Sequence, residues 1–169
     1  MKRVLISLAI VTMLIATIVM PAMAVEVGKD AVVTVTEVLD ISITDTGDDG
    51  IQFGTLDPDT SDNPDVDQSM ANDDTPAIAI TINTGTNVNC DINIKGTDFH
   101  STIPITGASW ALRHDEDPLH AMATTYGSVA TDIAPENTVG IWHFLTIPSD
   151  AAGGEHHSTF TYEVVGTSS

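Results

Sequence analysis

Hydrophobic and polar residues alternate with a period of two along most of the chain after residue 30, and helical periodicity is scarce. In the segment 31–44, one face of an extended strand would carry five aliphatic side chains, those of Val33, Val35, Leu39, Ile41 and Ile43. The opposite face would carry mainly threonine, serine and aspartate. Because successive side chains of a strand point to opposite sides, this alternation is typical of a half-buried strand. We therefore predict an N-terminal strand within residues 25–44.

Two isoleucine-rich segments, 76–83 and 87–96, continue the alternation and are joined by the turn sequence Thr-Gly-Thr. We interpret them as an antiparallel hairpin. Further alternating segments lie at 108–115, 137–148 and 158–166, and the last two are predicted to form a second hairpin. Proline, glycine and aspartate mark the connections between these segments, as they do in turns.

About seven to nine short strands with regularly spaced turns predict an all-β fold. We expect a single antiparallel β-sandwich, immunoglobulin-like or jelly-roll-like, within one domain of residues 25–169. A short strand is expected at 51–56 as well. The alternative is a β-rich fold with a true helix near residues 119–130.

The segment 57–76 departs from the alternation, since it is rich in aspartate and contains three prolines. We predict an acidic surface loop here rather than a strand. Calcium binds several carboxylate and carbonyl oxygens on flexible backbone. Five aspartates within eleven residues are therefore candidate calcium ligands: Asp57, Asp59, Asp62, Asp65 and Asp67. Their spacing does not match an EF-hand, and a solvated loop without a bound ion is the alternative.

Residues 1–24 have a different composition from the rest of the chain. Two basic residues precede a long apolar run, and the small residues Ala22 and Ala24 follow it. This order predicts an N-terminal signal helix that is cleaved between Ala24 and Val25. An uncleaved membrane anchor is the alternative, because the apolar run is almost long enough to span a bilayer. Cleavage would give a secreted protein, extracellular or at the cell surface, without membrane attachment.

The charge of the chain after residue 24 limits the classes of molecule that it can bind. It contains all 24 acidic residues but only three basic ones, Lys29, Lys95 and Arg113. Nucleic acid and anionic membrane surfaces would repel such a protein, whereas cations and carbohydrate remain suitable partners. Cys90 is the only cysteine, so no intrachain disulfide can form. We predict that it is a small core residue within a strand.

Catalytic motifs are absent from the sequence: it contains no GxSxG, P-loop or dinucleotide-binding fingerprint. The C-terminal segment 141–165 concentrates three histidines, but His143 falls in an aliphatic row, where a neutral core imidazole is expected. His156 and His157 are adjacent and would point to opposite sides of a strand. We therefore expect no catalytic residues, no cofactor other than a candidate calcium ion, and a protein that is not an enzyme.

The leader, the threonine- and valine-rich N-terminal strand and residues 140–164, "GIWHFLTIPSDAAGGEHHSTFTYEV", together resemble small secreted β-sandwich proteins of archaeal and bacterial surfaces. The similarity is to the TasA/camelysin-like group and the archaeal bundling pilins. It implies a structural subunit of an extracellular filament, pilus or sheath, assembled with copies of itself by exchange of the N-terminal strand. The alternative is a monomeric surface module that binds carbohydrate or calcium, with Trp110 and Tyr126 as candidate sugar-stacking residues.

Overall fold

The structure is a computed structural model that describes residues 37–167. The predicted signal helix and its cleavage site between Ala24 and Val25 lie outside the described residues, and so do Val33 and Val35 of the predicted N-terminal strand. Within residues 37–167, no helix combines the length and the hydropathy needed to cross a membrane.

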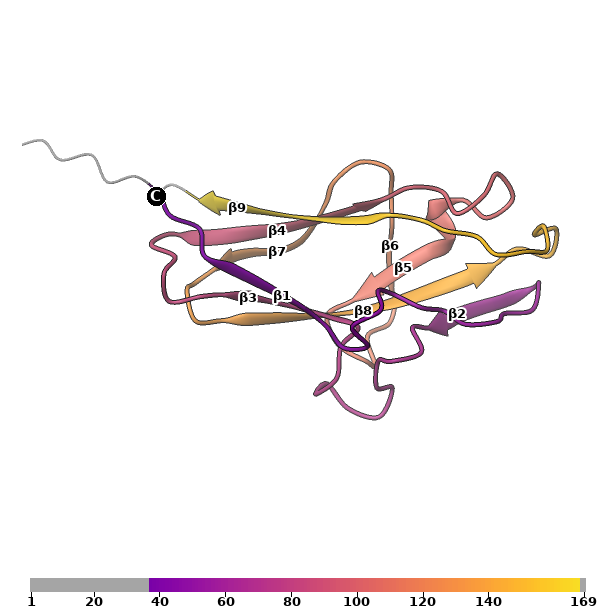
Figure 1. Cartoon of the computed structure of the whole chain (residues 1–169), viewed down its shortest axis with the longest axis horizontal. Helices are drawn as coiled ribbons and strands as arrows, with labels where there is room; N and C mark the ends of the chain where they lie inside the picture. Colours follow the sequence, from indigo (N-terminus) through magenta and orange to yellow (C-terminus); the bar gives the residue numbers. More distant parts are fainter. Residues whose placement is uncertain (1–36, 168–169) are drawn as a thin grey trace, which may run out of the picture. The chain divides into compact units, whose positions relative to one another are not determined.

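The described chain forms two antiparallel sheets that lie one above the other (Figure 1). The larger sheet has the strand order β1 (Ile41–Asp45), β3 (Ile78–Ile82), β8 (Thr138–Ile147), β5 (Ala108–Ala111) and β6 (His120–Ala121). In addition, β8 pairs with β2 (Thr60–Pro64). The smaller sheet has the order β7 (Gly127–Ile133), β4 (Asn89–Gly96) and β9 (Phe160–Thr167). A single turn of 3-10 helix, η1 (Ile105–Gly107), precedes β5.

The core lies between the two sheets and is built from the alternating rows. Ile80 and Ile82 of β3, Ile92 of β4 and Ile141 of β8 are completely buried in one hydrophobic cluster. Cys90 belongs to the same cluster, as predicted. The prediction of an antiparallel β-sandwich is thereby confirmed. The described residues contain no α-helix, and the segment near 119–130 forms β6 and the beginning of β7 instead.

Both predicted hairpins are wrong. β3 pairs with β1 and β8 in the larger sheet, whereas β4 pairs with β7 and β9 in the smaller one. β8 and β9 are likewise in different sheets. Each connection carries the chain across the sandwich, and in the first of them Thr86 Oγ1 accepts a hydrogen bond from Asp40 N at 2.8 Å. Alternation shows which side chains face the core. It does not show whether the next strand pairs with the first in the same sheet or packs against it from the facing sheet.

The acidic segment 57–76 is only partly the predicted loop, because it contains β2. This strand lacks an apolar row and is held through polar bonds to β8, such as the one from Asn63 Nδ2 to Leu145 O at 2.8 Å. Conversely, the strand expected at 51–56 does not form. Gln52 N there donates to the carboxylate of Asp65 at 2.6 Å, so its backbone is satisfied without a sheet ladder.

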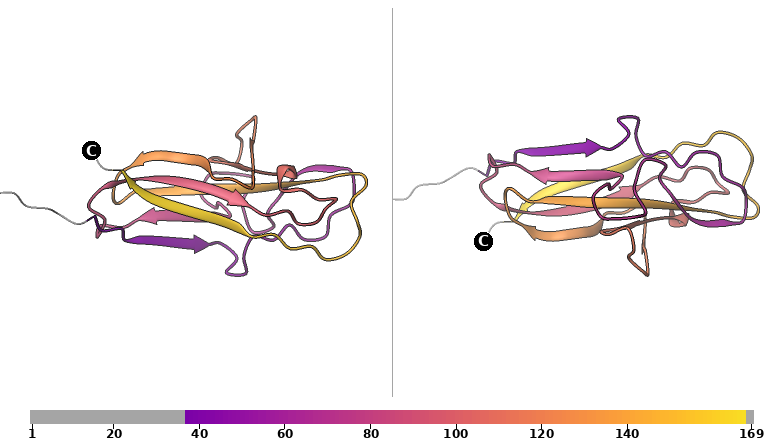
Figure 2. Two further views of the ribbon diagram at one scale, coloured as in Figure 1. Left: turned by 90° about the horizontal axis from the view of Figure 1, so that it is seen from above. Right: turned by 90° about the horizontal axis from the view of Figure 1, so that it is seen from below.

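The larger sheet extends beyond the smaller one on the β1 side. Both views in Figure 2 show β1 lying past the margin of β9. Ile41 packs against the core, but Ile43 on the same face of β1 is 54 % exposed. Within the predicted assembly strand, Ile41 and Ile43 pair with Ile82 and Ile80 of their own chain, and Leu39 precedes β1. This margin is therefore apolar and uncovered.

Candidate functional site

The outer edge of β9 has no strand beside it among residues 37–167. On its inner side β9 pairs with β4, and Thr97 N donates to Thr159 O at 3.1 Å just before the first paired residue. Because inward and outward backbone groups alternate in an antiparallel ladder, those of Phe160, Tyr162 and Val164 point away from β4. The edge is therefore able to accept another strand.

The side chains of β9 are less buried than those of its partner strand β4. Phe160, Tyr162 and Val164 face the core but remain half-buried, whereas their partners in β4, Ile92 and Ile94, are 0 % and 2 % exposed. The difference follows from position, since β4 has a strand on each side and β9 has one on only one side. An added strand would bury this row.

A groove of about 300 Å³ lies beside the edge of β9. Its walls are mainly apolar and aromatic, and they are formed by Gly50, Ile51, Phe53, Ile78, Phe99, Ser158, Thr159, Phe160 and Tyr162. Phe99 holds the aromatic side chains together: its ring lies 6.1 Å from that of Phe53 and 6.0 Å from that of Phe160, both edge to face. The groove is thus suited to small aliphatic side chains.

The described chain begins next to this edge. A Cβ placed on Gly166, near the end of β9, would lie 3.1 Å from Glu37 Oε2 and 3.5 Å from Leu39 Cδ2. Val38 is held by hydrogen bonds between its backbone and Asn87. Val38 and Leu39 are nevertheless 49 % and 42 % exposed. Residue 37, where the described chain begins, therefore lies near the C-terminal end of β9.

His143 of β8 and Tyr162 of β9 form a polar contact inside the sandwich. The Tyr162 hydroxyl and His143 Nε2 share a hydrogen bond of 2.7 Å, and His143 is completely buried. Burial lowers the pKa of His143 to about 3 and raises that of Tyr162. Nδ1 of His143 has no hydrogen-bond partner among the described residues. The expected neutral core histidine is confirmed.

His156 and His157 are at the surface, and they lie before β9, which begins at Phe160, rather than in a strand as predicted. His156 Nε2 donates to Ala152 O at 2.8 Å, and its ring lies 4.9 Å from that of His100. His157 contacts Glu155 at 3.3 Å, and both side chains are almost fully exposed. Neither residue belongs to a group of three metal-ligating side chains in the described part of the chain.

The five aspartates predicted to bind calcium are dispersed. Asp59 and Asp62 adopt left-handed backbone conformations on either side of the start of β2. Asp65 is buried, and its two oxygens accept backbone hydrogen bonds from Asp67 and Gln52. Burial raises the pKa of the Asp65 carboxyl, and these hydrogen bonds oppose the rise. Asp57 is the remaining member of the five. In residues 37–167, no three of these five side chains bring ligand atoms within 4.8 Å of one another. Calcium binding there stays a prediction.

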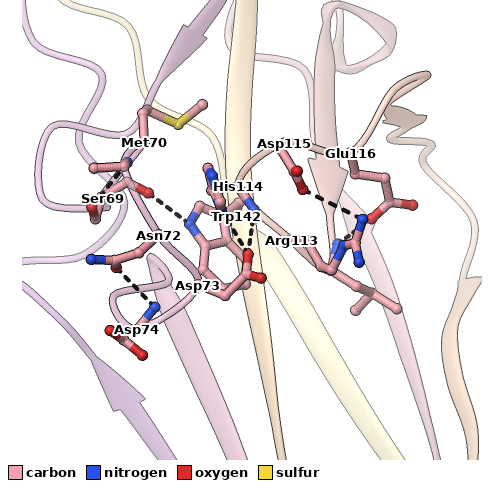
Figure 3. Close-up of polar contacts among 12 residues, drawn as sticks. Ser69, Met70, Asn72, Asp73, Asp74, Arg113, His114, Asp115, Glu116 and Trp142 are labelled. Carbon is pink, nitrogen blue, oxygen red and sulfur yellow. Dashed lines mark hydrogen bonds and ion pairs between the residues drawn. The ribbon is translucent and has the colours of Figure 1, made fainter.

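A different group converges on the outer face of the larger sheet (Figure 3). Asp73 lies in the connection before β3, and His114 and Asp115 lie in the connection after β5. Ligand atoms of these three side chains all lie within 4.8 Å of one another. The sequence pattern does not bring Asp73 and His114 together, because they are 41 residues apart in the chain.

A second groove of about 330 Å³ adjoins this group and has Asp73, Arg113, Gly140 and Trp142 among its lining residues. The aromatic side chains expected to stack on sugar are otherwise engaged. Trp110 is only 5 % exposed and stacks on His120 with ring centroids 4.3 Å apart. Tyr126 is exposed, but Lys95 Nζ lies 4.2 Å from the centre of its ring. The geometry thus favours the β9 edge over a carbohydrate site.

Comparison with protein-family models, with curated proteins and with solved structures finds no match to this chain.

Proposed function

We propose that the protein is a non-enzymatic, secreted structural subunit of an extracellular filament, pilus or cell-surface sheath, assembled by β-strand exchange. The observation that carries the proposal is the unpaired edge of β9 with its half-buried apolar row. The donor is the segment 25–36 of a neighbouring copy, which carries Val33 and Val35 on one face. Its backbone would complete the ladder, and its aliphatic side chains would fill the groove.

The energetics support a strand as the ligand of this edge. Burial of each valine side chain contributes roughly 1.5–3 kcal/mol. Covering the edge also protects it from unspecific pairing. Electrostatics are compatible, since the segment 25–36 contains Lys29 and only two acidic residues, whereas the rest of the secreted chain is strongly acidic.

The same segment could instead fold back on its own β9. It joins the fold beside Gly166, so it would then run toward its junction in the same direction as β9. Such a parallel pair is slightly less stable per residue than an antiparallel one. A strand donated by another copy is free to pair antiparallel, which favours exchange at high protein concentration.

The proposal is tested with the double variant Val33→Asp/Val35→Asp, compared with Thr34→Asp/Thr36→Asp as a control of equal charge on the opposite face. Sedimentation and electron microscopy of the purified protein measure polymerisation. We expect the valine variant to stay monomeric and the threonine variant to polymerise. Polymerisation of the valine variant, or a wild-type protein that remains monomeric at high concentration, would refute strand exchange.

A further inference from the structure

We propose that Asp73, His114 and Asp115 form a binding site for a divalent transition-metal ion such as Zn²⁺. The inference does not depend on the proposed assembly, because the three residues lie in the connections between β2 and β3 and between β5 and β6. It rests on the convergence of one imidazole nitrogen and two carboxylates within 4.8 Å, a grouping that no other residues of 37–167 provide.

Asp73 and His114 are already held in place before any ion binds. Asp73 Oδ1 accepts a hydrogen bond from His114 N at 2.9 Å and lies 2.8 Å from His114 Nδ1 (Figure 3). With metal–ligand bonds of about 2.0–2.2 Å, neighbouring ligand atoms around an ion are roughly 3 Å apart. An ion could therefore replace the proton shared by the two side chains with little movement of either.

The accessibility and chemistry of the donor set also suit metal binding. The side chain of His114 is 22 % exposed, which leaves its ring within reach of ions from solvent. A donor set of one imidazole and two carboxylates favours zinc, copper or nickel over calcium and magnesium, which prefer oxygen ligands alone.

Asp115 has to turn toward the ion. Its carboxylate now contacts Arg113 Nη2 at 3.5 Å, and the two side chains are 59 % and 64 % exposed. An exposed pair of this kind contributes little to stability, so its rearrangement costs little. Three protein ligands would leave one position of a tetrahedral ion for water.

The experiment is a zinc titration of the purified, untagged, chelator-treated protein by calorimetry, with thermal unfolding measured in parallel. We expect saturable zinc binding at one site with a raised Tm, and CaCl2 at equal ionic strength should not displace the bound zinc. His114→Ala and Asp115→Asn should each weaken zinc binding about tenfold or more. Asp115→Asn guards against misfolding, because this side chain is exposed.

The matched control is His120→Ala. His120 also pairs with a carboxylate, Glu116 Oε1 at 2.7 Å, but belongs to no group of three ligands in residues 37–167. We expect it to bind zinc like the wild type. The proposal is overturned if zinc does not bind, or if His114→Ala binds zinc as tightly as the wild type.

Discussion

The hydroxyl of Tyr162 in β9 lies 2.7 Å from Nε2 of His143 in β8, and this hydrogen bond joins the two sheets through the interior of the sandwich. Both side chains point into the hydrophobic core from strands of opposite sheets, so a polar contact adds to the apolar packing there. Its loss would leave a buried imidazole with neither ring nitrogen paired, since Nδ1 has no partner among the described residues.

The first prediction concerns this bond. Tyr162→Phe removes the hydroxyl and should lower the free energy of unfolding by about 1–3 kcal/mol, the usual cost of an unsatisfied buried polar group. Tyr126→Phe is the control, because Tyr126 is 41 % exposed and makes no such bond. Urea denaturation of the two variants measures the difference. Equal midpoints would show that the hydrogen bond contributes nothing.

The second prediction concerns pH. His143 titrates near pH 6.5 in the unfolded chain but only at about pH 3 in the folded protein. Between these pH values the unfolded state binds an additional proton, so acidification favours unfolding. The stability that the neutral, buried His143 contributes is fully present above pH 6.5 and is lost as the pH falls through this window. The stability difference between the wild type and His143→Gln should fall by up to about 1.4 kcal/mol per pH unit in this window. If the free energies of unfolding of the two proteins change with pH in the same way, the prediction is wrong.

The third prediction tests the close approach of η1 to β8. A Cβ on Gly107 would lie 2.9 Å from the backbone oxygen of Thr146, which cannot move aside like a side chain. Gly107→Ala should therefore destabilise the protein by about 1–3 kcal/mol. Gly153→Ala provides the control, since nothing lies within 4 Å of the added methyl group. Thermal unfolding of both variants checks the prediction, which fails if their Tm values agree.

The fourth prediction separates folding from assembly at the uncovered margin. Ile80→Ala, in the fully buried row of β3, should cost about 2–5 kcal/mol. Ile43→Ala should cost about 1 kcal/mol or less, because Ile43 is 54 % exposed. Because β1 lies past the margin of β9 (Figure 2), a strand added to β9 would cover Ile43, so under the proposed function Ile43→Ala weakens polymerisation while the monomer stays folded. Chemical denaturation and sedimentation together measure both effects; unchanged polymerisation would mean that the margin of β1 is not part of the interface.

The alternation of aliphatic and polar residues was sufficient to predict the fold class and much of the core. The alternating isoleucines of segments 76–83 and 87–96, among them Ile78, Ile80, Ile82 and Ile92, are buried in the core together with Cys90. A period of two can be read from neighbouring residues alone, because the geometry of an extended strand is local. The same pattern predicts a strand before residue 44; β1 (Ile41–Asp45) forms part of it, and Val33 and Val35 lie outside the described residues.

The tertiary structure decided which strands are neighbours, and therefore where the sites lie. The β3–β4 and β8–β9 connections cross between the sheets, and within residues 37–167 no strand pairs with the outer edge of β9. β2 forms without an apolar row, because the hydrogen bonds from Asn63 Nδ2 to Leu145 O and from Asp62 N to Thr146 Oγ1 attach it to β8. Asp73 meets His114 only because their connections lie on the same face of the larger sheet. These pairings join residues far apart in sequence, and no local pattern encodes them, since they depend on the closure of long loops and the packing of the whole core.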